Sequence, residues 1–250
     1  MNEAAKTHLF ICGLHRSGTT ALHEILKLHP EITGFSGTGK PKDEGQHLQG
    51  VIGVDGDFGG PGDFCFHGGA HLTERDLPAY AERLPELMSS WECLWAADRA
   101  VRIEKSPPNL IRARFLQAAF PDARFVFIVR HPLAVARATR KWSHASDEHL
   151  FRHWLQGHRI MMEDMSYLRR RCCVRYEDLA ADLNGALEQV WALAGVSSLP
   201  VHADSFSDHN PTYLNAGADF ALDDAEQHLL ARFGYELDPP FTRFGQRFGL

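Results

Sequence analysis

One short loop constrains the fold of this chain more than any other feature. Residues 9–12 read Leu-Phe-Ile-Cys, and residues 13–20 read Gly-Leu-His-Arg-Ser-Gly-Thr-Thr. From Thr20 to Leu28 apolar residues recur at intervals of three and four, as on one face of a helix, until Pro30 stops the pattern. The order predicts a buried strand, a tight loop and a helix.

The loop has the spacing of a phosphate-binding P-loop with one substitution. Gly13-x4-Gly18 is followed by Thr19 where the Walker motif has lysine. Such a loop wraps anions in backbone N–H groups at the positive end of a helix. Without the lysine, cleavage of a nucleoside triphosphate is poorly supported, but Arg16 still projects into an anion cradle. The hydroxyls at its rim belong to Ser17, Thr19 and Thr20. The alternative is a plain strand-to-helix turn with a chance arginine.

Further along the chain, apolar runs alternate with helical patterns. Strands are predicted at 101–103, 124–130 and 172–176, and helices at 77–95 (interrupted at Pro85), 107–120, 132–142, 148–169, 183–194 and 223–233. The run 124–130 is apolar on both faces, which is typical of a central parallel strand. We therefore predict an α/β fold: a P-loop-type three-layer domain, with a mainly parallel central sheet and helices on both faces, as a single domain over residues 1–250.

The segment 34–72 breaks this alternation. It holds 12 of the 21 glycines and has no apolar period, with one helical turn expected around 44–49. Irregular segments of this length in compact domains are usually functional lids or disordered insertions. Its phenylalanines favour a lid.

Composition narrows the function classes. The net charge of −6 argues against a broad basic face for nucleic acid, although it permits a small anion pocket. The five cysteines lack zinc-like spacing, and the pairs His67/His71 and His149/His153 lack a third ligand, so no metal is expected. The run 9–12 is too short for a signal peptide or a membrane span, so we expect a cytoplasmic protein without integral membrane association.

The loop and several later segments resemble those of sulfotransferases that use 3′-phosphoadenosine 5′-phosphosulfate (PAPS). Their 5′-phosphosulfate loop is a basic residue followed by Ser-Gly-Thr-Thr, as in residues 16–20. Residues 125–130, with the helix that follows, resemble the strand and helix that hold the cofactor's 3′-phosphate. Residues 104–107 (Glu-Lys-Ser-Pro) and 174–179 resemble two further family segments, so the likeness runs from Leu9 to about Ala194. It implies PAPS as donor, 3′-phosphoadenosine 5′-phosphate (PAP) as product, and no metal.

The resemblance assigns the cofactor-binding residues. Arg16, Ser17, Gly18, Thr19 and Thr20 correspond to the 5′-phosphosulfate loop, and Arg130 to the 3′-phosphate site. A guanidinium at the carboxyl end of a parallel strand also suits a phosphate on physical grounds. The family usually adds a serine eight residues after that arginine, where this chain has Ala138, with Thr139 or Arg137 as possible substitutes.

Two later segments resemble cofactor-contacting parts of the family. Tyr176 corresponds to a position near the adenine ring, although a buried strand tyrosine explains it nearly as well. Residues 210–213 lie where the family often has a loop that covers the cofactor.

The resemblance also implies the catalytic groups. Arg16 and Lys105 correspond to the cations near the transferring sulfuryl group. Cytosolic members carry a histidine base two residues after that lysine, where this chain has Pro107. Sulfotransferases that act on glycans and on tyrosine are a better match, because their base is a glutamate in the segment after the first helix. We therefore predict Glu44 as the base, with Asp43 raising its pKa by like-charge repulsion; the alternative is an exposed acidic loop.

The predicted activity is sulfuryl transfer to a hydroxyl or amine of a carbohydrate, lipid or small metabolite. The alternatives are a kinase-like P-loop enzyme and a nucleotide-binding module with a decayed site. Nothing in the sequence selects the acceptor or the oligomeric state.

Overall fold

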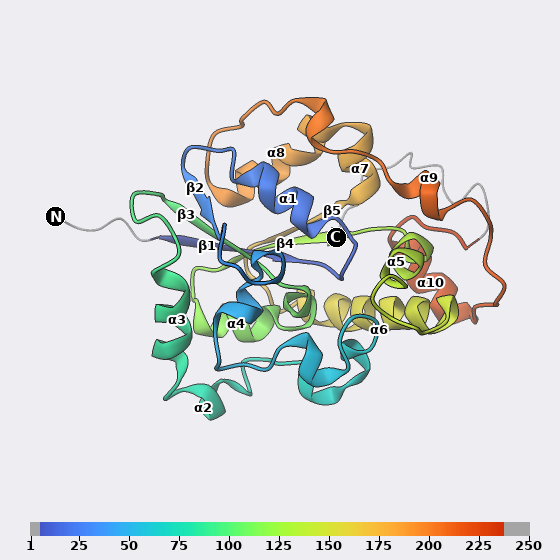
Figure 1. The fold of residues 1–250 in the computed structure, drawn as a ribbon, viewed down its shortest axis with the longest axis horizontal. Helices are drawn as coiled ribbons and strands as arrows, with labels where there is room; N and C mark the ends of the chain where they lie inside the picture. The colour runs from blue at the N-terminus through green and yellow to red at the C-terminus, as the bar shows by residue number, and fades with distance from the viewer. Residues whose placement is uncertain (1–5, 238–250) are drawn as a thin grey trace.

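A five-stranded parallel sheet forms the centre of the molecule (Figure 1). The structure, a computed structural model, describes residues 6–237. Along the chain the strands are β1 Thr7–Cys12, β2 Ile32–Gly34, β3 Val101–Lys105, β4 Arg124–Val129 and β5 Arg171–Arg175. Their order in the sheet is β2-β3-β1-β4-β5. The prediction of an α/β fold with a mainly parallel sheet is confirmed, but the edge strand β2 was missed, because three residues show no period.

Helices cover both faces of the sheet. They are α1 Thr19–Leu26, α2 Leu77–Tyr80, α3 Leu84–Glu92, α4 Ala113–Ala119, α5 Pro132–Thr139, α6 Asp147–Met165, α7 Tyr176–Ala181, α8 Leu183–Ala194, α9 Asn210–Tyr213 and α10 Asp224–Arg232. Figure 1 shows α1, α7 and α8 on one face and α3, α4 and α6 on the other. The predicted interruption near Pro85 is confirmed, because the pattern at 77–95 forms two helices. Pro85 is the second residue of α3, where a missing N–H costs nothing.

Alternation along β1 divides the core into two layers. Leu9 and Ile11 belong to the cluster packed against α1 and α8. Phe10 and Cys12 belong to the cluster on the opposite face, with residues of α3, α4 and α6. Since successive strand residues point to opposite faces, one apolar run supplies both layers. This arrangement confirms the predicted three-layer architecture.

The glycine-rich segment is built mostly of short 3₁₀ turns. They are Pro41–Asp43, Gly45–Leu48, Asp55–Phe58, Phe64–Phe66 and Gly68–Ala70. Phe35 and Phe64 are fully buried, whereas Phe66 is 46% exposed. Two of the phenylalanines that favoured a lid therefore pack in the core, and a lid function for this segment stays a prediction.

Hydrogen bonds to the end of β3 hold the part of the glycine-rich segment around Gly45 in place. The backbone N–H of Gly45 donates to Glu104 Oε1 at 3.0 Å, and that of Gln46 donates to Ser106 Oγ at 2.9 Å. Trp91 Nε1 donates to the carbonyl oxygen of Gly45 at 3.0 Å. A Cβ atom at Gly45 would lie 2.4 Å from Glu104 Oε1, so only glycine fits without displacing the carboxylate.

We expect Gly45→Ala to lower the free energy of unfolding by about 1–3 kcal/mol, because the added methyl group overpacks a buried site. Gly50 is the matched control, since a Cβ there meets open space and its φ is not positive. Gly50→Ala should leave stability unchanged or slightly raised. Urea denaturation of both variants checks this, and equal stability of the two would contradict the packing argument.

Candidate active site

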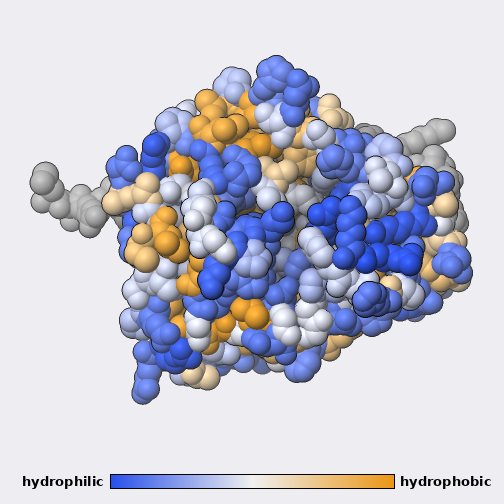
Figure 2. Space-filling view, in the orientation of Figure 1, coloured by the Kyte–Doolittle hydropathy of each residue, from blue (hydrophilic) through white to orange (hydrophobic). Residues whose placement is uncertain are grey.

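A pocket of about 370 Å³ lies at the edge of the sheet where the carboxyl ends of β1 and β4 meet. Parallel sheets commonly bind ligands at this edge. The lining residues are His15, Arg16, Gly18, Thr19, Thr20, Ala21, Lys42, Arg130, Trp142, Tyr176, Ser205, Phe206, Ser207 and His209. Three of these described residues are cationic and none is acidic, although the chain carries a net charge of −6. Strongly hydrophilic side chains also gather over α5 and α9 on this face (Figure 2). The pocket therefore suits an anion.

The loop between β1 and α1 has a constrained backbone. Gly18 has φ 101°, and a Cβ there would lie 2.9 Å from Tyr176 Cδ2. Arg16 adopts a left-handed φ of 66°, and its guanidinium lies over the Trp142 ring at 5.2 Å. It also hydrogen-bonds Tyr213; burial acts to raise the pKa of Tyr213, but this bond and nearby cations lower it.

The predicted loop hydroxyls have different environments. Ser17 Oγ donates to the carbonyl oxygen of Leu14 at 2.6 Å and is buried, so it closes the loop's own turn. Thr19 is also buried. Thr20 is exposed in the pocket, and its Oγ1 accepts a hydrogen bond from Lys105 Nζ at 3.3 Å.

Arg130 follows β4 directly and is buried with one donor unused. Its Nε donates to Asn210 Oδ1, and its Nη1 donates to the carbonyl oxygen of Arg16, both at 2.8 Å. Its Nη2 has no hydrogen-bond partner among residues 6–237. Burial lowers the pKa of Arg130, but a guanidinium still stays charged at neutral pH. A buried cationic N–H without a partner is costly unless a ligand satisfies it.

Asn210, the first residue of α9, orients this guanidinium. Its Nδ2 donates to Glu177 Oε1 at 2.8 Å, while its Oδ1 accepts from Arg130. The carboxylate thereby fixes the amide, and the amide fixes the arginine. The sequence pointed to residues 210–213 as a cofactor loop, but it gave no sign of Glu177 or of this contact across 80 residues.

Tyr176 lies beside Arg130 on the pocket wall. The guanidinium lies 4.1 Å from the centre of its ring, and the Phe206 ring packs at 4.9 Å. Its hydroxyl donates to the carbonyl oxygen of Ser207 and accepts from the backbone N–H of His209. Burial raises the pKa of Tyr176. The predicted strand position is wrong, because β5 ends at Arg175 and Tyr176 starts α7.

The segment of α5 that follows Arg130 leaves no free group for a phosphate. Ala138 is fully buried, and Thr139 Oγ1 donates to the carbonyl oxygen of Val135 at 2.7 Å. Arg137 donates to Asp147 and to the carbonyl oxygen of Tyr213. Both substitutes for the family's serine are therefore engaged within the protein.

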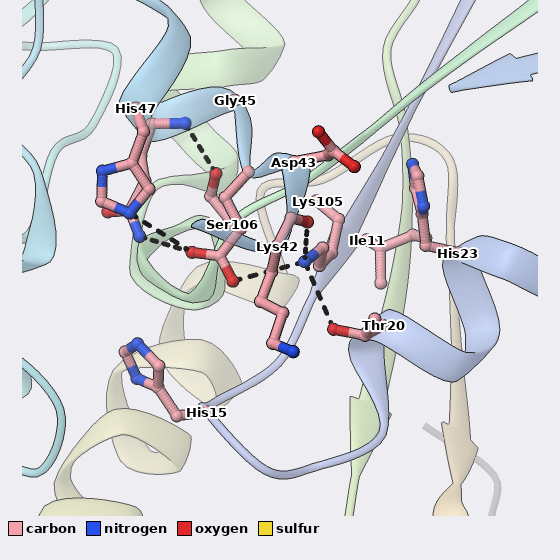
Figure 3. Close-up of polar contacts among 12 residues, drawn as sticks. Ile11, His15, Thr20, His23, Lys42, Asp43, Gly45, His47, Lys105 and Ser106 are labelled. Atoms are coloured by element: carbon pink, nitrogen blue, oxygen red, sulfur yellow. Dashed lines mark hydrogen bonds and ion pairs between the residues drawn. The ribbon is translucent and has the colours of Figure 1, made fainter. Parts of the chain in front are cut away.

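Lys105 and Glu44, which the sequence analysis assigns to one site, meet beside the pocket. Figure 3 shows the Lys105 ammonium in contact with Lys42 and Thr20. The Lys105 side chain is fully buried, and its Nζ lies 3.3 Å from Glu44 Oε1. The same Nζ donates to the carbonyl oxygen of Lys42 at 2.9 Å and to Thr20. Burial lowers the pKa of Lys105, and the Glu44 carboxylate opposes that shift.

The neighbours of Glu44 have separate tasks. Glu44 Oε2 accepts a hydrogen bond from Gln46 Nε2 at 2.7 Å. The Asp43 carboxylate accepts instead from the hydroxyl and the N–H of Thr38, and these bonds lower the pKa of Asp43. Figure 3 shows Asp43 on the far side of Lys105 from His47. The predicted influence of Asp43 on the pKa of Glu44 stays a prediction.

The carboxyl group of Glu104, the residue before Lys105, is also buried. Desolvation raises its pKa to about 7.

The histidine pairs have other partners. Asp63 Oδ1 lies 2.7 Å from His149 Nε2, and His153 Nε2 accepts from the backbone N–H of Cys65. Within the described part of the chain, no group of three or more His, Cys, Asp or Glu side chains is placed to hold a metal ion. Among residues 6–237, no helix combines the length and the apolar character needed to cross a membrane.

Comparisons with known proteins agree with this architecture. The sulfotransferase domain from the curacin biosynthetic pathway shares 19% identity, over 93% of this chain and 99% of that one, with a TM-score of 0.56. A sulfotransferase from Alicyclobacillus acidocaldarius shares 17% identity, over 92% and 91% of the two chains, with a TM-score of 0.51. At such identities the likeness supports the fold alone. No curated protein sequence matches significantly.

The family comparison goes further than the fold. Residues 8–200 match the sequence model described as the Sulfotransferase family, which covers more than half of the chain. The matched range includes the pocket-lining residues from His15 to Tyr176 but not those from Ser205 to His209. The chain belongs to the sulfotransferase family.

Proposed function

We propose that this sulfotransferase takes its sulfuryl group from PAPS and transfers it to a hydroxyl or amine of a carbohydrate, lipid or small metabolite in the cytoplasm. The observation that carries the proposal is the cationic pocket, which has no described acidic lining residue and adjoins the Glu44–Lys105 pair. A donor that carries both a phosphate and a phosphosulfate matches a pocket lined by three cations, Arg16, Lys42 and Arg130.

Each part of the donor can be matched to side chains of the pocket. The unpartnered Nη2 of Arg130 suits the 3′-phosphate. Arg16, with the loop residues Gly18 to Thr20, suits the 5′-phosphosulfate, because the loop leads into the amino end of α1. Tyr176 and Phe206 offer aromatic surface for the adenine.

The reaction then needs three protein contributions. The acceptor oxygen attacks the sulfur, a new O–S bond forms, and the S–O bond to the 5′-phosphate breaks with its electron pair on the leaving PAP. Glu44 takes the acceptor's proton. Lys105 and Arg16 stabilise the negative charge that grows on the leaving phosphate. No oxidant or reductant is involved.

The main alternatives are a kinase-like enzyme and a decayed nucleotide-binding module. Thr19 occupies the position of the Walker lysine, and no described carboxylate lines the pocket to hold magnesium near a triphosphate. Magnesium-dependent turnover of ATP would favour the kinase-like alternative. Binding of PAP without transfer to any acceptor in a broad panel would favour the decayed module.

We expect PAP to stabilise the protein selectively, whereas AMP, ADP and ATP–Mg²⁺ do so less. At one hundred times its Kd, a ligand that binds only the folded state adds about 2.7 kcal/mol of stability. Arg130→Ala should weaken PAP binding about tenfold or more, because it removes a charge-assisted contact. Arg159→Ala, which removes an exposed arginine of α6, is the control. Thermal-shift titration measures both. A PAP shift that survives Arg130→Ala, or an equal shift with ATP–Mg²⁺, would contradict the proposal.

We expect Glu44→Gln to retain PAP binding and to reduce kcat by about 10²–10⁴-fold, because the amide cannot accept the acceptor's proton. Glu82→Gln is the matched control, because it makes the same change at an exposed glutamate outside the pocket lining and should leave turnover unchanged. Initial rates with an acceptor found by screening provide the measurement. Near wild-type turnover in the Gln variant would exclude Glu44 as the base.

A further inference from the structure

The turn before Glu44 has two consecutive residues in a conformation that normally requires glycine. Lys42 has φ 52° and ψ 22°, and Asp43 has φ 50°. Non-glycine residues rarely adopt this region, and such strain persists only where the surrounding contacts hold it. Here the carbonyl oxygen of Lys42 accepts from Lys105 Nζ, and the Asp43 carboxylate accepts from Thr38. Lys42 therefore keeps an unfavourable backbone conformation next to the Glu44–Lys105 pair.

This backbone conformation places the side chain of Lys42 in the pocket. It lines the pocket, and Figure 3 shows it running past the Lys105 ammonium toward Thr20. Its Nζ makes no hydrogen bond or ion pair with any described residue. The other two cations of the pocket wall each have a side-chain partner, Arg16 in Tyr213 and Arg130 in Asn210, although Arg16 Nε and Arg130 Nη2 stay unpartnered among residues 6–237. Of these three lining side chains, Lys42 is the one that has no hydrogen-bond or ion-pair partner at all in the described part of the chain.

We propose that Lys42 is a further catalytic residue, which binds the oxygens of the sulfuryl group during its transfer. The proposal rests on the proposed sulfuryl transfer from PAPS and adds a cation that the motifs do not contain. Arg16 reaches the same pocket from the P-loop, and Lys42 reaches it from the segment that carries Glu44. Charge on the sulfuryl oxygens would thus be held from two separate segments.

The connections of Lys42 separate this role from binding of the 3′-phosphate. Its carbonyl oxygen accepts a hydrogen bond from Lys105 Nζ, and Lys105 Nζ also contacts Glu44 and Thr20. Arg130 instead contacts Asn210, Tyr176 and the carbonyl oxygen of Arg16. Lys42 therefore belongs to the part of the site that holds the reacting group. PAP lacks that group, so PAP and PAPS should respond differently to its removal.

The test compares the affinities of PAP and PAPS by calorimetry in the absence of acceptor. Lys42→Gly removes the ammonium and suits the left-handed backbone, so its melting temperature should not fall. We expect this variant to bind PAPS about tenfold more weakly while its affinity for PAP is unchanged, as for loss of one charge-assisted contact. Lys42→Arg should restore the preference for PAPS. Lys40→Ala, which removes an exposed positive charge outside the pocket lining, should change neither affinity.

Three results would overturn the proposal. One is an equal loss of PAP and PAPS affinity in Lys42→Gly, which would indicate a general electrostatic effect. Another is unchanged affinity for both ligands, and the third is the same PAPS-specific loss in Lys40→Ala. Failure of the wild-type protein to bind either nucleotide would overturn the proposed function itself, and the role of Lys42 with it.

Discussion

The buried ammonium of Lys105 holds the start of α1 and the turn around Glu44 together. A lysine taken out of water is unfavourable unless its charge and its donors are matched. Here the matching comes from two chain segments, the P-loop helix through Thr20 and the strained turn through Lys42 and Glu44. Removal of any one partner leaves a buried cation partly unsatisfied, so the geometry of the pocket depends on all of them together.

The alternation of β3 explains how one strand end controls the turn so closely. Glu104 and Lys105 are successive residues and point to opposite faces of the sheet. Glu104 accepts from the backbone N–H of Gly45, while Lys105 donates to the carbonyl oxygen of Lys42 and pairs with Glu44. The turn is therefore held on both sides of Glu44. This support offsets the cost of a left-handed backbone at Lys42.

Local patterns predicted the scaffold and several parts of the site. Apolar runs marked β1, β4 and β5, and the glycine spacing marked the loop that brings Arg16 next to Arg130. Family motifs pointed to Glu44 and Lys105, which lie together although 61 residues separate them. Edge strand β2 was missed because it is too short to show a period, and the boundary at Tyr176 was misplaced by one residue.

Contacts between distant segments left no such signal. The support of Arg130 by Asn210 and Glu177, and the placement of the Lys42 side chain, depend on folded geometry rather than on spacing. Ala138 illustrates the consequence. The motif alone indicates a weakened phosphate site, because the usual serine is absent. The structure adds that neither Arg137 nor Thr139 is free to replace it, but it also shows an arginine whose direction is set by the amide of Asn210. A donor fixed in this way loses little conformational entropy when it binds an anion. If the proposed function holds, this gain would offset part of the loss of the serine hydroxyl.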